Sequence, residues 1–469
     1  MRKKLGQMKI LIKWGILFFL FLFLIFPFKT FADRGIFVWP PEIHLNQSAQ
    51  NAIVAWNGKE EIIILSTNFE KNKFCGWSSY GECINDSDCR IGGCSKQVCE
   101  SKNEGVITTC EWKDCYDAKK YGKKCQCIKG KCQWANKEKE DKEVLILEVL
   151  PLPSKPTKVK SVSANIFEKL VTILNEKIKK LRSDFLKHKE AGERAFNLTP
   201  PIEIVFEKTI GAHNITIVKV NNLNYFLNWI DEFTQKRNLD KKQVSLKLKE
   251  GLKNYFKRDI KYFVFDVVNL EDIKNSIKPI LYKFSSDYLY YPMLISGISE
   301  IKESNSNINL FLMVDEKINF PKVLWRNGKN YFVSDQKLEI KLKKEELEKI
   351  SKDLKNLFEN GVKVRKISFY GKLNSINKDL MIFPQKIWKR NLWIGKFGKD
   401  IKTLQKILIN EGVWGSLVGA TGYFGPITKR ALIKFQEKYQ TEILSPINLK
   451  KGTGFFGPLT RSFLKETSF

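Results

Sequence analysis

A nine-residue segment near the C-terminus occurs twice, and it constrains the fold more than any other feature of the chain. It reads TGYFGPITK from Thr421 and TGFFGPLTR from Thr453, so the two copies start 32 positions apart. A repeat of fixed period usually marks one supersecondary unit that is used twice. In each copy a glycine permits a tight turn, and Pro426 or Pro458 suits the first turn of a helix. The repeat therefore predicts two successive turn–helix units.

The cysteines are confined to one short stretch of the chain. All ten of them lie between Cys75 and Cys132, and the rest of the 469 residues has none. The stretch has no Cys-x-x-Cys pair and no histidine, so the usual zinc-ligand spacings are absent. We expect five disulfides, with the connectivity left open, among Cys75, Cys83, Cys89, Cys94, Cys99, Cys110, Cys115, Cys125, Cys127 and Cys132.

This stretch resembles the small eight-cysteine-cluster modules of exported prokaryotic proteins. The resemblance rests on residues 86–89, 92–94 and 125–127, together with Cys132 and Trp134. It implies a disulfide-rich module at residues 74–134 in an oxidising compartment. Asp86 and Asp88 are interpreted as turn residues, because the calcium-binding loop pattern of EF-hands is not met.

Residues 1–32 have the pattern of a signal peptide. Basic residues precede an apolar run at positions 14–26, and the small-residue pattern Thr30-Phe31-Ala32 follows. The run is short for a membrane-spanning helix. We expect export and cleavage after Ala32. Because no cysteine lies near this position, lipid anchoring at the cleavage site is excluded. An uncleaved N-terminal anchor, and with it a membrane association, is the alternative.

The chain is strongly basic, with a formal net charge of +30 at pH 7. Lysines are interspersed with acidic residues, as in the sequence EELEK at 345–349. The charge is therefore interpreted as a solvated basic surface. A polyanionic partner outside the cell is the alternative, and no nucleic-acid partner is expected.

The region 33–384 is expected to form a mixed α/β (α+β) main domain. Strands are predicted on both sides of the Asn57-Gly58 hairpin turn, at 52–56 and 62–65, and also at 144–150, 215–220, 262–268, 280–282, 310–314 and 366–369. Helices are predicted at 164–190, after the capping residue Asn222, at 241–256 and at 344–359. Because strand-like sequence stops before the cysteines and resumes after them, we expect the disulfide-rich module to be inserted between two strands of one sheet.

The same region, without its cysteine stretch, resembles an uncharacterised family of exported bacterial domains. The resemblance covers residues 33–383 and rests on four short segments, at 50–54, 150–154, 222–229 and 291–296. It implies no known activity.

No recognised catalytic motif occurs in the chain. The three histidines, His44, His188 and His213, lie in different segments, and none has a metal-ligand spacing. Since every cysteine lies in the disulfide-rich stretch, we expect no thiolate nucleophile beside a histidine. No catalytic residue, metal or cofactor is therefore expected. A glycosidase needs only two carboxylates, and the 51 acidic residues leave that class open.

From residue 388 onward the chain strongly resembles the peptidoglycan-binding-like domain, a small three-helix module of wall hydrolases and other envelope proteins. The resemblance covers residues 395–464 and rests on the segment 393–408 and on both copies of the repeat, and it departs from the family pattern at 413–420 and 441–451. It implies non-covalent attachment to peptidoglycan by an all-α module at residues 388–469.

The composition of residues 388–469 suits such a ligand, because 14 Lys and Arg face only five Asp and Glu. Cationic side chains can bind the carboxylates of peptide stems or anionic wall polymers, and exposed aromatic rings can stack on sugars. Most of the motif residues, including Leu404 and Phe435, are expected to determine the fold. The candidate ligand-binding residues are Trp414, Tyr423, Phe424, Gly425, Thr428, Lys429, Arg430 and Lys434.

Together these features predict an exported protein, extracellular and associated with the cell wall or membrane, that binds peptidoglycan through its C-terminal module. The role of the main domain is left open. Two alternatives stand beside this hypothesis. One is a peptidoglycan-lytic enzyme whose catalytic carboxylates lie in the main domain, and the other is a surface adhesin that acts through its cysteine-rich module.

Overall fold

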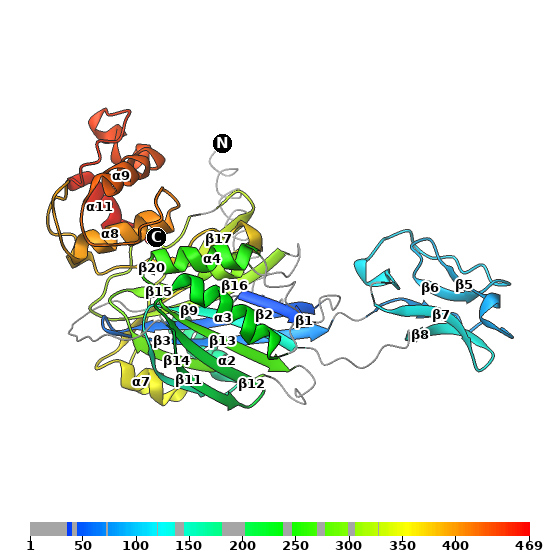
Figure 1. Ribbon diagram of the computed structural model, residues 1–469. Helices are drawn as coiled ribbons and strands as arrows, with labels where there is room; N and C mark the ends of the chain where they lie inside the picture. Colours follow the sequence, from blue (N-terminus) through cyan, green and yellow to red (C-terminus); the bar gives the residue numbers. More distant parts are fainter. Residues whose placement is uncertain are drawn as a thin grey trace, which may run out of the picture.

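The computed structural model describes residues 35–39, 45–71, 74–119, 121–136, 145–180, 202–237, 246–269, 277–298, 305–326 and 328–469. The predicted signal peptide and its cleavage position lie outside these ranges. Among the described residues, no helix has the length and apolar character needed to span a membrane. The chain forms a main domain of two sheets, a disulfide-rich insert and a helical C-terminal module (Figure 1).

One layer of the main domain is an antiparallel five-stranded sheet. Its strand order is β1 (Gly35–Trp39), β9 (Leu145–Leu152), β13 (Tyr262–Asn269), β12 (His213–Val220) and β11 (Ile202–Ile210). Its outer face packs against α3 (Leu223–Gln235) and α4 (Leu246–Lys257). The side chain of Asn222 accepts hydrogen bonds from the N–H groups of Asn224 and Tyr225, which confirms Asn222 as the N-cap of α3.

The second layer is an eight-stranded sheet. Seven strands follow the order β10 (Pro156–Ser161), β14 (Ile280–Ser285), β3 (Glu60–Lys71), β2 (Leu45–Trp56), β16 (Asn305–Asp315), β19 (Val362–Lys372) and β17 (Tyr331–Asp335), and β18 (Ile340–Leu342) also pairs with β19. The predicted Asn-Gly hairpin is confirmed, because β2 and β3 flank Gly58, whose φ is +95°. β16 pairs with β2 in parallel.

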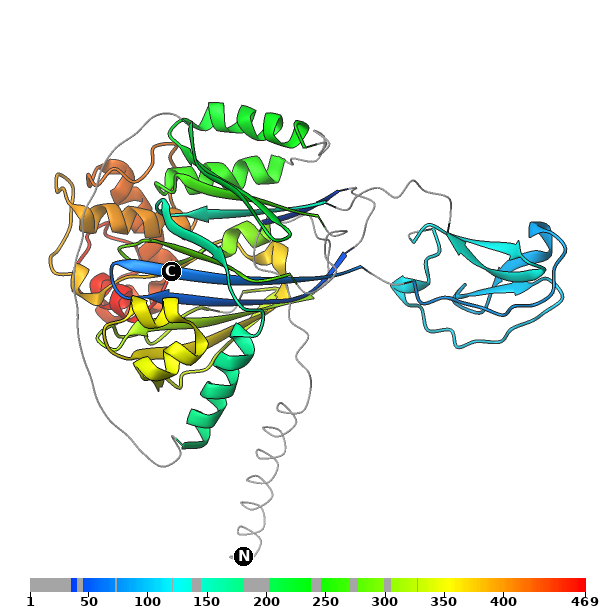
Figure 2. The same cartoon turned by 90° about the horizontal axis from the view of Figure 1, so that it is seen from below.

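The two sheets pack face to face, and helices cover both outer faces (Figure 2). Side chains alternate along each strand, so Phe263 and Phe265 of β13 face α3 while Val264 and Val268 face the other sheet. The outer face of the eight-stranded sheet carries α2 (Ile166–Lys180), α6 (Lys344–Ile350) and α7 (Lys352–Leu357). These four layers confirm the predicted mixed α/β main domain.

The structure corrects two sequence predictions about the main domain and adds strands that were not predicted. The insert does not join two strands of one sheet, since β3 before it belongs to the eight-stranded sheet and β9 after it to the five-stranded sheet. The helix predicted at 344–359 is divided at Ser351, which has extended backbone (φ −163°, ψ 133°) and caps α7 by accepting a hydrogen bond from the N–H of Asp353. Strands β10, β11, β17 and β18 of the two sheets were not predicted. The part of the helix predicted at 164–190 that follows Lys180, and residues 241–245 of the next predicted helix, lie outside the described residues.

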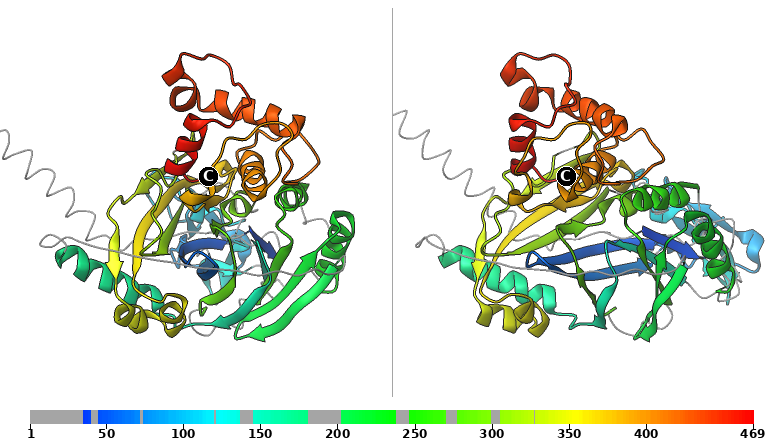
Figure 3. Two further views of the ribbon diagram at one scale, coloured as in Figure 1. Left: turned by 90° about the vertical axis from the view of Figure 1, so that its left-hand side faces the viewer. Right: turned by 60° about the vertical axis from the view of Figure 1, so that its left-hand side comes forward.

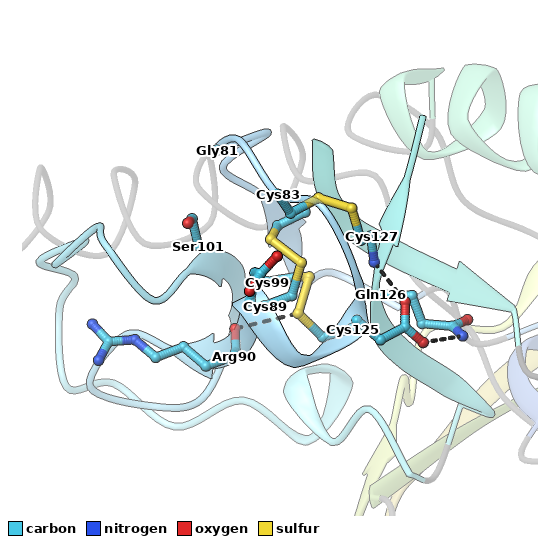
Figure 4. Close-up of a disulfide and its surroundings, with 12 residues drawn as sticks. Gly81, Cys83, Cys89, Arg90, Cys99, Ser101, Cys125, Gln126 and Cys127 are labelled. Carbon is cyan, nitrogen blue, oxygen red and sulfur yellow. Dashed lines mark hydrogen bonds between the residues drawn. A yellow bond between two sulfur atoms is a disulfide. The ribbon is translucent and has the colours of Figure 1, made fainter. Parts of the chain in front are cut away.

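Five disulfides cross-link the insert, which confirms the predicted number. Figure 4 shows the surroundings of one of them, Cys83–Cys127. The insert consists of a small sheet of β4 (Trp77–Ser78), β6 (Val98–Ser101) and β5 (Cys89–Gly92), and a hairpin of β7 (Lys123–Ile128) and β8 (Lys131–Asn136). The pairs are Cys75–Cys115, Cys83–Cys127, Cys89–Cys132, Cys94–Cys110 and Cys99–Cys125. Three of them join the hairpin to the preceding segments, so cross-links take the place of a large core.

The aspartates of the insert have the turn role that the sequence indicates. The carboxylate of Asp86 accepts hydrogen bonds from the N–H of Cys127 and the side chain of Gln126, at 2.9 and 3.0 Å (Figure 4). Asp88 accepts two further backbone hydrogen bonds, from Ile84 and Asn85. These bonds hold the pKa of both carboxyl groups below the ordinary value.

The remaining elements form the C-terminal module and the part of the main domain against which it packs. The module contains α8 (Lys399–Asn410), α9 (Pro426–Lys438), the short α10 (Gln440–Ile443) and α11 (Pro458–Glu466). It packs against α5 (Met293–Gly297) and the small sheet of β15 (Leu289–Tyr291) and β20 (Leu380–Ile382), whose buried side chains share one hydrophobic cluster with those of the module. The module and the insert lie at opposite ends of the molecule (Figures 1 and 2).

Candidate functional site

The two copies of the repeat have the same backbone geometry. Gly422 and Gly454 both have positive φ, +85° and +68°, which only glycine adopts readily. Gly425 and Gly457 are extended N-caps with φ of −96° and −95°, and each is followed by a proline at the start of a helix, α9 or α11. The structure thus confirms the two predicted turn–helix units.

A buried glutamine from the preceding helix holds each turn in the same way. Gln405 of α8 accepts a hydrogen bond from the N–H of Gly422 and donates to the carbonyl of Tyr423 and the hydroxyl of Thr428. Gln436 of α9 makes the equivalent three bonds to Gly454, Phe455 and Thr460. These glutamines were missed from the sequence. The sequence does carry a signal for them, because Gln405 and Gln436 lie at almost the same distance before Gly422 and Gly454.

One short segment, which begins at Leu392 and precedes both turns in the chain, forms backbone hydrogen bonds with each of them. At its start, Leu392 pairs with Phe456 of the second copy through two backbone hydrogen bonds of 3.2 and 3.0 Å. Further along, the N–H of Gly395 donates to the carbonyl of Phe424, and the N–H of Phe424 donates to the carbonyl of Lys396. The segment therefore brings its own side chains next to both turns.

Two exposed aromatic pairs result from this arrangement. Tyr423 and Phe455 occupy the same position in the two copies and are 39% and 41% exposed. The ring of Phe397 lies 4.6 Å from that of Tyr423, and the ring of Trp393 lies 6.2 Å from that of Phe455. Trp393 and Phe397, which are 46% and 68% exposed, stand four residues apart, so at most about 14 Å of chain separates the two pairs. Clustered exposed apolar side chains of this kind mark interaction surfaces.

Glycines and lysines complete the surface around these aromatic pairs. A Cβ at Gly425 would lie 3.1 Å from the ring of Tyr423, and a Cβ at Gly457 would lie 2.9 Å from the ring of Phe455. Each ring thus lies over a glycine. The Nζ of Lys396 lies 4.4 Å from the centre of the Trp393 ring, and the aliphatic part of Lys429 packs on Gly454 beside Phe455.

The residues predicted to bind ligand fall into three groups. Tyr423, Lys429, Arg430 and Lys434 are exposed. Phe424, Gly425 and Thr428 are buried within the module, because they form the turn and its hydrogen bonds, and so they support the surface without facing a ligand. Trp414 is half-buried and donates a hydrogen bond to the carbonyl of Val418, in a loop whose end, Ala420, bonds to the carbonyl of Lys257 in the main domain. Trp393, Phe397 and Phe455 were missed, although the repeat itself aligns Phe455 with Tyr423.

The module is packed onto the main domain and shares its hydrophobic core. Leu404 and Phe435 of the module belong to the same cluster of buried side chains as Phe226 and Tyr255. The last residues of the chain add backbone contacts, since the N–H of Phe469 donates to the carbonyl of Met381 at 3.0 Å. The orientation of the module is therefore set by the main domain (Figure 3).

A buried ion pair reinforces this junction. The guanidinium of Arg258 in α4 lies 2.6 Å from the carboxylate of Asp379, and neither side chain is more than 1% exposed. Asp379 also accepts hydrogen bonds from the hydroxyls of Tyr255 and Tyr290. Asn410, at the end of α8, accepts from Arg258 and bonds to the backbone of Asp379 in both directions. The module thus supplies one member of a buried network.

A second buried carboxylate joins both parts of the molecule. Glu411 accepts hydrogen bonds from Lys378 of the main domain and from Lys438 and Tyr439 of the module, at 2.5, 2.6 and 2.5 Å. Burial alone would raise the pKa of the Glu411 carboxyl. The charges of the two lysines and their hydrogen bonds outweigh burial and lower this pKa to about 2.

Comparison with known families agrees with these observations. A family model described as "Putative peptidoglycan binding domain" matches residues 397–443, which contain α8 and α9. The C-terminal module is similar to peptidoglycan-binding domains. A second model, described as "CGP-CTERM domain protein", matches residues 21–184, which contain the disulfide-rich insert. Together they confirm the predicted wall-binding-like module and the cysteine-rich character of the N-terminal region.

Other comparisons say little about this protein. No curated protein matches the chain. The crystal structure of baculovirus P35 has 9% sequence identity and a TM-score of 0.31, over 74% of this chain and 99% of that chain. A mutated baculovirus P35 after caspase cleavage has 10% identity and a TM-score of 0.29, over 72% and 100%. TM-scores this low do not indicate a common fold.

Proposed function

We propose that this protein is exported and binds peptidoglycan non-covalently, with the two aromatic pairs of the C-terminal module as its contact surface for the glycan. The observation that carries the proposal is that Tyr423 and Phe455, at equivalent positions of the repeat, are both exposed and both paired with a second exposed ring. Aromatic rings offer large, rigid apolar faces at low entropic cost, and sugar rings carry C–H faces that can stack on them.

Charge around the rings supports an acidic ligand. Lys429, Arg430 and Lys434 are exposed on α9, and Lys396 lies beside Trp393. Guanidinium and ammonium groups bind carboxylates, which the peptide stems of peptidoglycan carry. Anionic wall polymers would bind the same groups, so the proposal includes them as a second ligand.

The covalent chemistry of the insert supports export. Dense disulfides are typical of proteins in oxidising environments outside the cytosol, and the match to the CGP-CTERM description also suggests an exported or surface protein. Because the module is docked on the main domain, a wall-bound molecule would hold the insert at the end opposite the wall (Figure 1). We therefore propose that the main domain acts as a rigid spacer between the wall and the insert.

Co-sedimentation of residues 33–469 with purified peptidoglycan tests the proposal. The double variant Trp393→Ala/Phe455→Ala should bind about tenfold more weakly, since losing one aromatic contact of about 1.4 kcal/mol changes Kd by that factor. Phe397→Ala/Tyr423→Ala should have a similar effect.

Tyr225→Ala is the matched control, because Tyr225 is an aromatic residue of α3 that is 65% exposed and far from the repeat in sequence. It should leave binding unchanged. Wild-type affinity in both double variants would show that the aromatic pairs are not the contact surface. Failure of the wild-type protein to sediment with peptidoglycan would contradict the function itself.

The insert favours adhesion as a second candidate function. Its surface exposes large apolar side chains, including Ile107 at 96% and Trp112 at 57%. The full chain and a variant with Trp112→Ser/Ile107→Ser can be compared for attachment to neighbouring cells. Equal attachment by both proteins would exclude a role of these two side chains.

A further inference from the structure

Three titratable side chains meet inside the main domain, between its two sheets. Glu148 of β9, His213 of β12 and Asp266 of β13 are only 1%, 3% and 1% exposed. One ligand-capable atom of each lies within 4.8 Å of the corresponding atoms of the other two. None of these residues takes part in the proposed wall-binding surface.

The pairing of the strands explains why they meet. Glu148 lies directly opposite Asp266 in the pairing of β9 with β13. Asp266 lies opposite Ile215 of β12, two positions after His213. Side chains two positions apart on a strand share a face, so all three point to the same side of the five-stranded sheet. Their neighbours on that side, such as Ile217 and Val264, belong to the core between the sheets.

The contacts of His213 define where its protons lie. Its Nε2 is 3.2 Å from the carbonyl oxygen of Lys278. A carbonyl only accepts hydrogen bonds, so Nε2 carries a proton. In the neutral imidazole, Nδ1 then has a lone pair, and this atom lies 2.7 Å from a carboxylate oxygen of Asp266. Two acceptor atoms at this distance require a proton or a metal cation between them.

We propose that Glu148, His213 and Asp266 bind one divalent transition-metal ion, with Zn²⁺ the cation that the donor set suits. Imidazole nitrogen and carboxylate oxygen are both Zn²⁺ ligands, at about 2.0 to 2.2 Å. Two ligand atoms on such an ion stand about 3 Å apart, so the contact between His213 and Asp266 would open by a few tenths of an ångström. One divalent charge balances two carboxylates.

The outer contacts of the cluster fit a metal-binding histidine. Ligating histidines usually donate their second ring N–H to a carbonyl or carboxylate, and the Nε2 of His213 has the Lys278 carbonyl in that place. The ligands come from three adjacent strands of one sheet, which is a rigid frame. Because all three are buried, the ion would enter while the sheets assemble and would stabilise the folded main domain.

Metal content is the direct test. Residues 33–469, exported without a histidine tag from cells supplied with Zn²⁺ and then dialysed, should contain one equivalent of zinc by mass spectrometry. His213→Gln and Asp266→Asn should each lose that equivalent. Glu61→Gln is the matched control, because Glu61 is a fully buried carboxyl of β3 outside the cluster, and this variant should keep its zinc.

A second measurement covers variants that fail to fold. Wild-type protein unfolded and refolded with a chelator should have a lower Tm than protein refolded with Zn²⁺, and Zn²⁺ added during refolding should restore it. Absence of zinc from the wild-type protein, together with an unchanged Tm on refolding with Zn²⁺, Mn²⁺ or Co²⁺, would overturn the proposal. A shared proton would then link His213 and Asp266. Neither result depends on wall binding, so it stands apart from the test of the proposed function.

Discussion

The substitution Glu411→Gln removes one buried negative charge from the junction between module and main domain. In the native protein the Glu411 side chain has no exposed surface, and two lysines bind it. Lys378 is itself only 13% exposed, whereas Lys438 is 44% exposed. The variant keeps the shape of the side chain but leaves two neighbouring ammonium groups without their carboxylate.

The magnitude follows from the pKa of this carboxyl group. Its pKa is about 2 in the folded protein against an ordinary value of 4.5. A difference of about 2.5 units, at about 1.4 kcal/mol each, corresponds to about 3 kcal/mol of folding free energy. Because the folded-state pKa lies below that of the unfolded chain, this contribution is fully present above pH 4.5 and is lost as the pH falls toward 2.

Urea unfolding at a series of pH values, followed by tryptophan fluorescence, measures this contribution. We expect the variant to be about 3 kcal/mol less stable than wild type at neutral pH, and this gap to close as the pH falls toward 2. Glu466→Gln is the control, since the Glu466–Lys322 pair is exposed, at 48% and 74%, and should contribute little. Parallel pH profiles of wild type and Glu411→Gln would refute the assignment of the low pKa to Glu411.

Four further substitutions test the junction and the repeat by the same unfolding assay. Gln405→Leu removes three hydrogen bonds from a buried turn and should cost about 2 to 4 kcal/mol, and Gln436→Leu should cost a similar amount if the two copies are equivalent. Asp379→Asn leaves the buried guanidinium of Arg258 uncompensated and should cost about 3 to 5 kcal/mol, much of which the added change Arg258→Met should recover. Gly422→Ala places a side chain at a φ of +85° and should cost about 1 to 2 kcal/mol; an unchanged midpoint would contradict the role of this turn.

Local features of the sequence determined the local structure of this protein. The Asn57-Gly58 dipeptide is sufficient for a hairpin turn, and glycine and proline at fixed offsets are sufficient for the two turn–helix units, because these residues restrict φ directly. The confinement of all cysteines to one stretch predicted a cross-linked module. Its connectivity could not be read from spacing, since it depends on which segments lie within bonding distance.

Residues far apart in the chain decided the rest. Strands β3 and β9 are both apolar, and their sequences do not reveal that they belong to different sheets, because hydrophobicity shows that a strand is buried but not which strand it pairs with. The same limit applies to function. Strand pairing alone places His213 beside Glu148 and Asp266, and the backbone pairing of the segment after Leu392 with both turns creates the exposed aromatic pairs. Such arrangements arise from contacts that tertiary packing selects, so the sequence indicated a module similar to peptidoglycan-binding domains, and Tyr423 within it, but not the rings of Trp393, Phe397 and Phe455 beside it.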